Sequence, residues 1–152
     1  MKKIFVILIA ALIIIACTRT ENGIVFGIPD YEKRAIKVTR IDLEILLKAK
    51  ELISIKESWV NNNIRICEAS EPYNLYCVLE AASIIVDKKY IHRRAAIQEV
   101  RFTIADNYKD RWKVHRLADF NSHPKTTYQD VIDVLDLTIN RIRKKLKHSR
   151  IN

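Results

Sequence analysis

Residues 128–146 read YQDVIDVLDLTINRIRKKL, and their apolar side chains recur at steps of three and four. This spacing places them on one face of an α-helix and leaves the charged side chains on the other. Thr126 with Gln129, or Thr127 with Asp130, offers a capping box directly upstream. The stretch therefore predicts a long amphipathic helix that packs against other helices. Its apolar positions are Tyr128, Val131, Ile132, Leu135, Ile139, Ile142 and Leu146.

The sequence before this helix contains few residues that break helices. Between Asp30 and Asn152 there is no glycine, and the only prolines are Pro72 and Pro124. Sheets with many tight turns need such residues, so their scarcity favours helices throughout this region.

A first helix is predicted to begin at Thr39, where Asp42 three residues later completes a capping-box arrangement. We expect it to end or bend at residues 61–63, with 64–67 as a short continuation. Its apolar residues keep helical spacing and predict one buried stripe. They are Ile41, Ile45, Leu46, Ala49, Leu52, Ile53 and Trp59.

Three more helices are predicted between this one and the last. The first of them follows the Ser-Glu-Pro of residues 70–72 and is apolar nearly all round up to residue 86, which is typical of a central helix. The next runs from about residue 91 to 106, with apolar residues on two sides. A shorter helix is expected over residues 109–120.

The N-terminus has the parts of a secretory signal. Two lysines at positions 2 and 3 precede an uninterrupted apolar stretch, residues 4–15, which is followed by the small Ala16 and then Cys17. Twelve helical residues cover roughly 18 Å, which is well short of the roughly 30 Å hydrocarbon core of a membrane. We therefore expect the segment to insert but not to remain as a span. Residues 14–17, Ile-Ile-Ala-Cys, resemble the lipobox of bacterial lipoproteins.

This resemblance implies a signal peptide of residues 1–16, cut between Ala16 and Cys17. It also implies a diacylglycerol thioether on Cys17 and a fatty acid such as palmitate on the new amine, a covalent lipid and no other cofactor. Such acylation anchors a protein stably. The residue after the cysteine is Thr18 and not Asp, which resembles the enteric lipoproteins that are sorted to the outer membrane. This resemblance implies that the protein is anchored at the periplasmic face of the outer membrane. A plain secretory cut or a retained anchor is the alternative.

Once Cys17 is lipidated, the remaining cysteines are Cys67 and Cys77. An even pair in an oxidising compartment predicts a disulfide. Zinc ligands are usually paired two to four residues apart, whereas nine residues intervene here, so we expect no metal at the pair. A free catalytic thiol is disfavoured because the second cysteine would quench it.

Together these features predict an all-α fold, a four- or five-helix antiparallel bundle with one intramolecular disulfide. The bundle is expected over residues 38–148, behind a flexible N-terminal tether formed by residues 17–37. About 110 ordered residues are enough to bury a core.

The net charge of +9 is concentrated at the C-terminus. Residues 141–152 form a basic tail in which no acidic residue interrupts the cations. An exported chain rarely meets nucleic acid, so we expect no nucleic-acid partner and consider contact with anionic lipid. The alternative is a solvated helix end whose cations suit the helix dipole. These cations are Arg141, Arg143, Lys144, Lys145, Lys147 and Arg150.

One cluster of residues is a candidate anion or partner site, and its members occur in two short segments. His115 and Asp119 are four residues apart, so on one helix the carboxylate could orient the imidazole as in a general base. No glycine-rich phosphate loop, nucleophile elbow or zinc-protease motif accompanies them, so no catalytic residue is assigned. The candidate residues are His92, Arg93, Arg94, His115, Arg116 and Asp119.

Two other interpretations of this cluster remain open. In one, the arginines pair with Glu80, Asp87 or Asp119 inside the bundle, while Asp119 and Asn121 cap chain ends. In the other, the cluster binds a phosphate or carboxylate of an envelope component. His92, His115 and His123 have no recognisable metal-ligand spacing, and no metal is expected.

Most aromatic residues lie within apolar stripes and are expected in the core. Tyr73 and Tyr76 are the exception, because they lie beside the predicted disulfide. A disulfide-held loop with aromatic side chains is a plausible contact surface.

The sequence therefore favours a lipid-anchored bacterial envelope protein that is not an enzyme and acts through contacts with a protein partner. An accessory role in secretion or envelope assembly is one form of this, and secretion pilotins are similar in size and anchoring. The alternatives are a small enzyme or anion-binding module that uses the candidate residues, and a protective or immunity lipoprotein.

Overall fold

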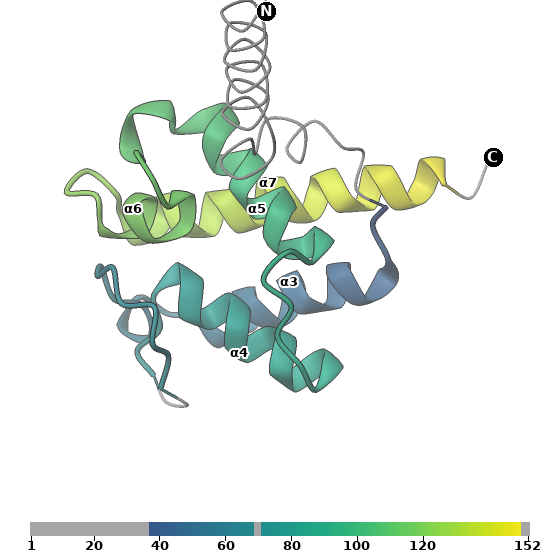
Figure 1. Ribbon diagram of the computed structural model, residues 1–152, viewed down its shortest axis with the longest axis horizontal. Helices are drawn as coiled ribbons and strands as arrows, with labels where there is room; N and C mark the ends of the chain where they lie inside the picture. Colours follow the sequence, from purple (N-terminus) through teal and green to yellow (C-terminus); the bar gives the residue numbers. More distant parts are fainter. Residues whose placement is uncertain (1–36, 69–70, 150–152) are drawn as a thin grey trace, which may run out of the picture. The chain divides into compact units, whose positions relative to one another are not determined.

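The computed structural model describes residues 37–68 and 71–149, and this part of the chain is all-helical (Figure 1). Within those ranges there is no β-strand, and one isolated parallel bridge joins Trp59 and Tyr73. The predicted helical bundle is confirmed. Its elements are α3 (Arg40–Leu52), η1 (Lys56–Ser58), α4 (Leu75–Asp87), α5 (Ala95–Asn107), η2 (Lys109–Arg111), α6 (Arg116–Ser122) and α7 (Tyr128–His148).

Several predictions fall outside the described residues. They are the signal peptide, the cut between Ala16 and Cys17, the lipid on Cys17, the tether up to residue 36, and the last tail cation, Arg150. In the described part of the chain, every helix is too short or too polar to cross a membrane.

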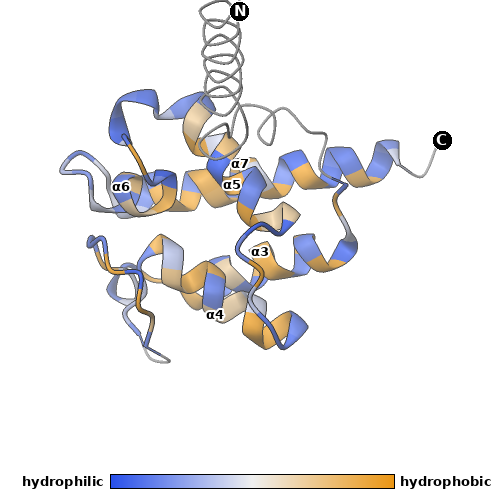
Figure 2. Ribbon diagram, viewed as in Figure 1, coloured by the Kyte–Doolittle hydropathy of each residue, from blue (hydrophilic) through white to orange (hydrophobic). Residues whose placement is uncertain are grey.

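Helix α7 packs against α3 and α5, while α4 packs against α3 and α6. Helix α5 runs antiparallel to α7: Glu99 near the start of α5 pairs with Lys145 near the end of α7, whereas Arg111, after α5, pairs with Asp130 at the start of α7. Apolar and polar segments alternate along α7 in Figure 2. The largest fully buried side chains include Phe120, Ile45, Leu46, Ile53, Leu75, Leu79, Ile97, Ile104, Leu117, Leu135 and Ile142.

Some residues of the predicted stripes lie elsewhere. Ile41 of α3 is exposed, and so are Ile84 and Ile85 of α4, so the end of α4 is not central as predicted. In α7 the buried face also contains Val134 and Thr138. Thr138 is accommodated because its hydroxyl donates to the Val134 carbonyl one turn earlier, at 2.6 Å.

Two helix starts are as the sequence predicts. Thr39 caps α3 in a capping box with Asp42, and Thr127 caps α7 in a capping box with Asp130. Asp42 has a second role that its position in the sequence does not reveal. Its Oδ1 accepts a hydrogen bond from the backbone N–H of Ala96 at 3.1 Å, so the carboxylate of α3 also caps the start of α5.

Other predicted boundaries are wrong, and hydrogen bonds at the helix ends explain two of them. Helix α3 ends at Leu52, where the Tyr128 hydroxyl donates to the Ile53 carbonyl at 2.8 Å and satisfies the helix end. Helix α4 begins after Asn74, whose side chain accepts from the Cys77 N–H at 2.8 Å, and not after residues 70–72.

The remaining two boundary errors concern the segments that carry the candidate residues. Helix α5 begins at Ala95, so residues 91–94 form a turn that precedes it. The helix predicted over 109–120 is divided into η2 and α6, with residues 112–115 between them. Both corrections move histidines off helix faces and into connecting segments.

The predicted disulfide is confirmed, because Cys67 and Cys77 are bonded with their Cα atoms 5.3 Å apart. Asn121 of α6 is a second long-range connection. Its Oδ1 accepts from Trp59 Nε1 at 2.8 Å and from the Leu75 N–H at 3.0 Å, and its Nδ2 donates to the carbonyls of Val60 and Asn62 at 3.0 and 2.8 Å. It is fully buried and uses its complete hydrogen-bonding capacity.

The basic C-terminal segment is partly neutralised by the bundle. Residues up to His148 continue α7. Lys145 and Arg141 both pair with Glu99, which is 0% exposed, and Arg141 also pairs with Asp106 at 2.8 Å. A buried carboxylate is tolerated when it is paired in this way.

Candidate functional site

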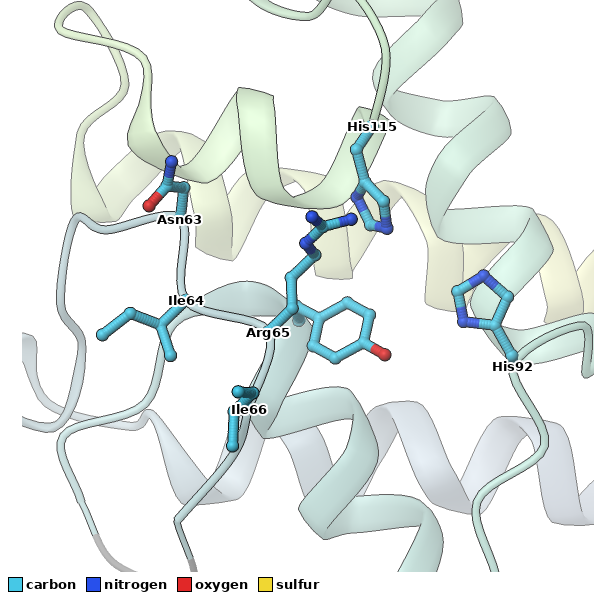
Figure 3. Close-up of a pocket in the computed structure, with 7 residues that line it drawn as sticks. Asn63, Ile64, Arg65, Ile66, His92 and His115 are labelled. Carbon is cyan, nitrogen blue, oxygen red and sulfur yellow. The ribbon is translucent and has the colours of Figure 1, made fainter.

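The described residues contain an open pocket of about 730 Å³ between four segments of the chain (Figure 3). The loop before the disulfide forms one wall, the first turn of α4 contributes Tyr76, the turn before α5 contributes His92, and the start of α6 contributes His115. The lining residues are Asn63, Ile64, Arg65, Ile66, Tyr76, His92 and His115.

The loop wall, residues 61–68, is fixed at several points. The disulfide joins Cys67 to α4. Asn74, the cap of α4, donates from Nδ2 to the Asn62 side chain at 2.7 Å and to the Ile64 carbonyl at 2.8 Å. Asn121 binds the Asn62 carbonyl from the other side. The loop therefore lacks secondary structure but is held by side-chain bonds and a covalent link.

His115 is the cap residue of α6. Its Nδ1 accepts a hydrogen bond from the Ala118 N–H at 3.2 Å, so in the neutral imidazole the proton is on Nε2. Burial, followed by the charges of Arg101 and Arg65, lowers the pKa of His115 below its ordinary value of 6.5, and Asp119 opposes this only in part.

The predicted pairing of His115 with Asp119 is wrong. Asp119 Oδ2 instead accepts hydrogen bonds from the backbone N–H groups of Lys113, Val114 and His115 at 2.9, 2.7 and 2.9 Å. Because His115 lies at the cap and not inside the helix, the two side chains do not share a helix face. Burial alone would raise the pKa of Asp119, but these bonds lower it below 3.8. Asp119 thus fixes a turn and does not orient an imidazole.

His92 is held by a guanidinium. Arg101 donates to His92 Nε2 at 2.9 Å and to the His92 carbonyl at 2.9 Å. A guanidinium can only donate, so Nε2 carries a lone pair and the proton of neutral His92 is on Nδ1, 3.2 Å from the Tyr90 hydroxyl. Burial, then Arg101, His115 and Arg93, lower the pKa of His92.

The two imidazoles belong to an aromatic cluster. Their ring centroids are 6.3 Å apart, and Tyr76 lies 5.7 Å from His115 and 6.3 Å from His92. Tyr90 contacts Tyr76 at 6.0 Å and His92 at 6.1 Å. Burial and a hydrogen bond with Tyr76 raise the pKa of Tyr90 far above its ordinary value. These shifts in pKa favour the neutral forms of Tyr90, His92 and His115 at neutral pH.

The other predicted site residues are distributed around the pocket and do not line it. Arg94 pairs with Asp87, as the structural interpretation of the cluster predicts. The guanidinium of Arg116 lies over the Trp112 ring, 4.6 Å from its centroid. Arg93 acts electrostatically on His92. Of the six candidates, only the two histidines line the pocket.

Two arginines of the site are not among the residues predicted from the sequence. Arg65 lines the pocket, and Arg101 holds His92 from α5. Arg65 is two residues before Cys67, so the predicted disulfide was the available signal. Arg101 lies inside a predicted helix and gave no local signal. Figure 3 shows the Arg65 side chain extending toward His115.

Exposed apolar side chains occur among the lining residues, Ile64 and Ile66, and at Val114, which directly precedes the lining residue His115. Ile66 is 88% exposed and Val114 is 93% exposed, while Ile64 is 53% exposed. We refer to these three residues as the rim. Within the described ranges, no group of three histidine, cysteine or acidic side chains comes close enough to hold a metal ion.

Comparison with known proteins places this bundle in a family. The model of a family of unknown function, DUF6197, matches residues 39–141, a segment that begins at the cap of α3 and contains every pocket residue. No curated protein and no solved structure matches the chain. Because the matched segment covers more than half of the sequence, the chain belongs to the DUF6197 family.

Proposed function

We propose that this chain is a lipid-anchored bacterial envelope protein, held at the periplasmic face of the outer membrane, that binds a protein partner through the rim and pocket. The proposal has two parts, a location and a mode of action. The location is supported by the sequence of residues 1–17. The mode of action is supported by the rim.

The observation that carries the mode of action is the exposure of Ile66 and Val114 on a fixed frame. Almost the whole surface of each side chain faces solvent. Neighbouring backbone is held by the disulfide on one side and by Asp119 on the other. An apolar side chain on a fixed frame costs little entropy to immobilise in a complex, and removing its apolar surface from water favours association.

A non-catalytic role is supported by the hydrogen bonds of the imidazoles. The basic nitrogen of each is already occupied: His92 Nε2 accepts from Arg101, and His115 Nδ1 accepts from the Ala118 N–H. A general base needs a free lone pair within reach of its substrate. These histidines serve as donors and as structural elements of the pocket wall.

The disulfide also supports the location. A structural cysteine pair persists in an oxidising compartment and is rare in a reducing cytosol. Cys67 and Cys77 are bonded in this domain. The pair is therefore the one feature of the folded domain that agrees with export.

The partner surface is tested by photo-crosslinking in cells. A photoreactive amino acid at position 66 or at position 114 is expected to yield the same adduct, competed by added wild-type domain but not by domain carrying Ile66→Asp. Glu57 of η1 is exposed and provides the control position. The absence of an adduct, or an equal adduct from position 57, would overturn the proposed mode of action.

The anchor is tested separately by mass spectrometry of the N-terminal peptide of the mature chain. A diacylglyceryl and acyl modification on Cys17 is expected, together with recovery in the outer-membrane fraction. Cys17→Ser should abolish the modification and leave the precursor uncut. An unmodified N-terminus in the wild-type chain would refute the location without affecting the crosslinking result.

A further inference from the structure

We infer that the pocket binds a phosphate-type oxyanion between Arg65 and His115. This goes beyond the proposed function, and it does not depend on the lipid anchor or on the rim. Three observations support it: the positive charge around the pocket, the hydrogen-bond donors available there, and the hydrogen bonds and ion pairs that already engage two carboxylates of this region.

Positive charge predominates at the pocket. Arg65 is one of its lining residues, Arg101 lies against His92, and Arg93 acts on His92 from the same turn. No acidic side chain is among the lining residues of the described pocket. Among residues 37–68 and 71–149, no ion pair involves Arg65. A cation in this position attracts an anion because its charge is not compensated locally.

Two carboxylates of this region are engaged in bonds of their own. Asp119, which opposes the field at His115, accepts three backbone hydrogen bonds in its own turn. Asp87 is paired with Arg94. An incoming anion therefore does not have to displace either of these two carboxylates.

Two donors are available to such an anion. The Nδ1 of His115 is used by the α6 cap, which leaves its Nε2–H as a donor toward the pocket. The Arg65 guanidinium extends toward the same imidazole (Figure 3). A planar guanidinium can bind two oxygens of one phosphate, and hydrogen bonds between charged partners are the stronger ones.

The surroundings favour a dianion such as a phosphate monoester. Arg65 and Arg101 both act on His115, so more than one positive charge is within electrostatic range of a bound group. The pocket is open, so the phosphate can be free or can be the end of a larger molecule, such as a lipid headgroup. The shared chemistry is the terminal phosphate group.

Binding is tested by calorimetric titration of the detergent-purified full chain with inorganic phosphate at neutral pH and constant ionic strength. Arg65→Gln and His115→Asn are each expected to weaken binding roughly tenfold or more, as expected for a lost charge-assisted hydrogen bond. His115→Asn is informative because asparagine also caps helices and so preserves α6. Arg143→Gln, on an exposed position of α7, removes the same charge and should leave binding unchanged.

The inference is overturned if the wild-type chain does not bind phosphate. It is also overturned if all three variants lose affinity equally, because the binding would then depend only on the net charge of the chain. A second arm uses phosphatidylcholine vesicles with and without phosphatidic acid. If binding to the phosphatidic acid vesicles requires Arg65, the bound phosphate group is that of a lipid headgroup. If the chain binds inorganic phosphate but not these vesicles, the ligand is the free ion. Neither result depends on the crosslinking at Ile66, so this inference and the proposed function can fail independently.

Discussion

The bundle core and the pocket region are stabilised by different physical means. The core of α3, α5 and α7 is held by apolar burial spread over many side chains, including Ile45, Ile104 and Leu135. The pocket region consists of connecting segments between helices, held by one disulfide and by a few polar side chains. Truncating one core side chain removes a small share of the buried apolar area, although the cavity left behind is costly, whereas one change in the pocket region removes one of the few connections that hold it.

The largest effect is expected when Asn121 is replaced by alanine. The change removes four hydrogen bonds and leaves buried donors and acceptors of Trp59, Leu75 and Val60 without partners. We expect the free energy of unfolding to fall by about 3 kcal/mol or more, measured by urea denaturation. Asn61→Ala, which removes two exposed bonds, should cost under about 1 kcal/mol and is the control. Similar losses for both variants would show that the pocket region is stabilised diffusely, like the core.

The next effect concerns the disulfide. Cys67→Ser opens a loop of about 11 residues and should cost about 2.8 kcal/mol in the chain-entropy model. Because the core does not depend on this loop, the far-ultraviolet circular dichroism should be retained while amide exchange rises in residues 61–68. Reduction of the wild-type chain is the matched comparison and should give the same change. A loss of helix content on reduction would contradict the separation between the two regions.

The contrast between the regions also explains what the sequence could predict. Periodicity and capping boxes depend on residues three or four apart, so the cores of α3 and α7 and their starts at Thr39 and Thr127 were predictable. The disulfide was predictable because only two cysteines, Cys67 and Cys77, remain once Cys17 is assigned to the predicted lipobox. The start of α4 was predicted too early: its cap, Asn74, is a local one that binds the Cys77 N–H, but the Leu75 N–H is bound by Asn121, 46 residues away, and that contact gives no local signal.

The candidate site was predicted only in part for the same reason. His92 and His115 attracted attention as titratable residues, and the structure places them together. Their actual partners, Arg101 and the Ala118 N–H, follow from where α5 and α6 begin. An error of a few residues at a helix start changes a side chain from a helix face to a cap. The suggested orientation of His115 by Asp119 failed through such an error.

A smaller effect tests Asp42, a buried carboxylate that links α3 to α5. Asp42→Ala should cost about 2 kcal/mol, because it removes the capping box of α3 and the acceptor for the Ala96 N–H of α5. Thr39→Ala impairs only the cap of α3 and should cost about 1 kcal/mol. Denaturant titration measures the free energy of unfolding of both variants, and the difference between them is the contribution of Asp42 to capping α5. Equal losses would mean that α5 needs no cap from Asp42.

The smallest effect is the response of the pocket region to mild acid. The folded-state pKa values of His92 and His115 are lowered below 6.5, so the unfolded chain binds more protons than the folded one as the pH falls through this value. Stability contributed by the neutral rings is therefore complete above about pH 6.5 and is lost progressively below it. The lowered pKa values of Asp119 and Asp130 give a separate loss that begins only near their ordinary value of 3.8.

The free energy of unfolding measured between about pH 8 and pH 5 distinguishes these windows. The loss of stability below about pH 6.5 has a specific structural reason. A proton on His92 Nε2 would face the Arg101 guanidinium, and a proton on His115 Nδ1 would remove the acceptor for the Ala118 N–H. The double variant His92→Asn, His115→Asn should therefore have a flatter profile above about pH 5. A wild-type profile that is flat in this range would contradict the assigned tautomers. If the free energy of unfolding of the double variant depends on pH as steeply as that of the wild type, groups other than His92 and His115 cause the acid sensitivity.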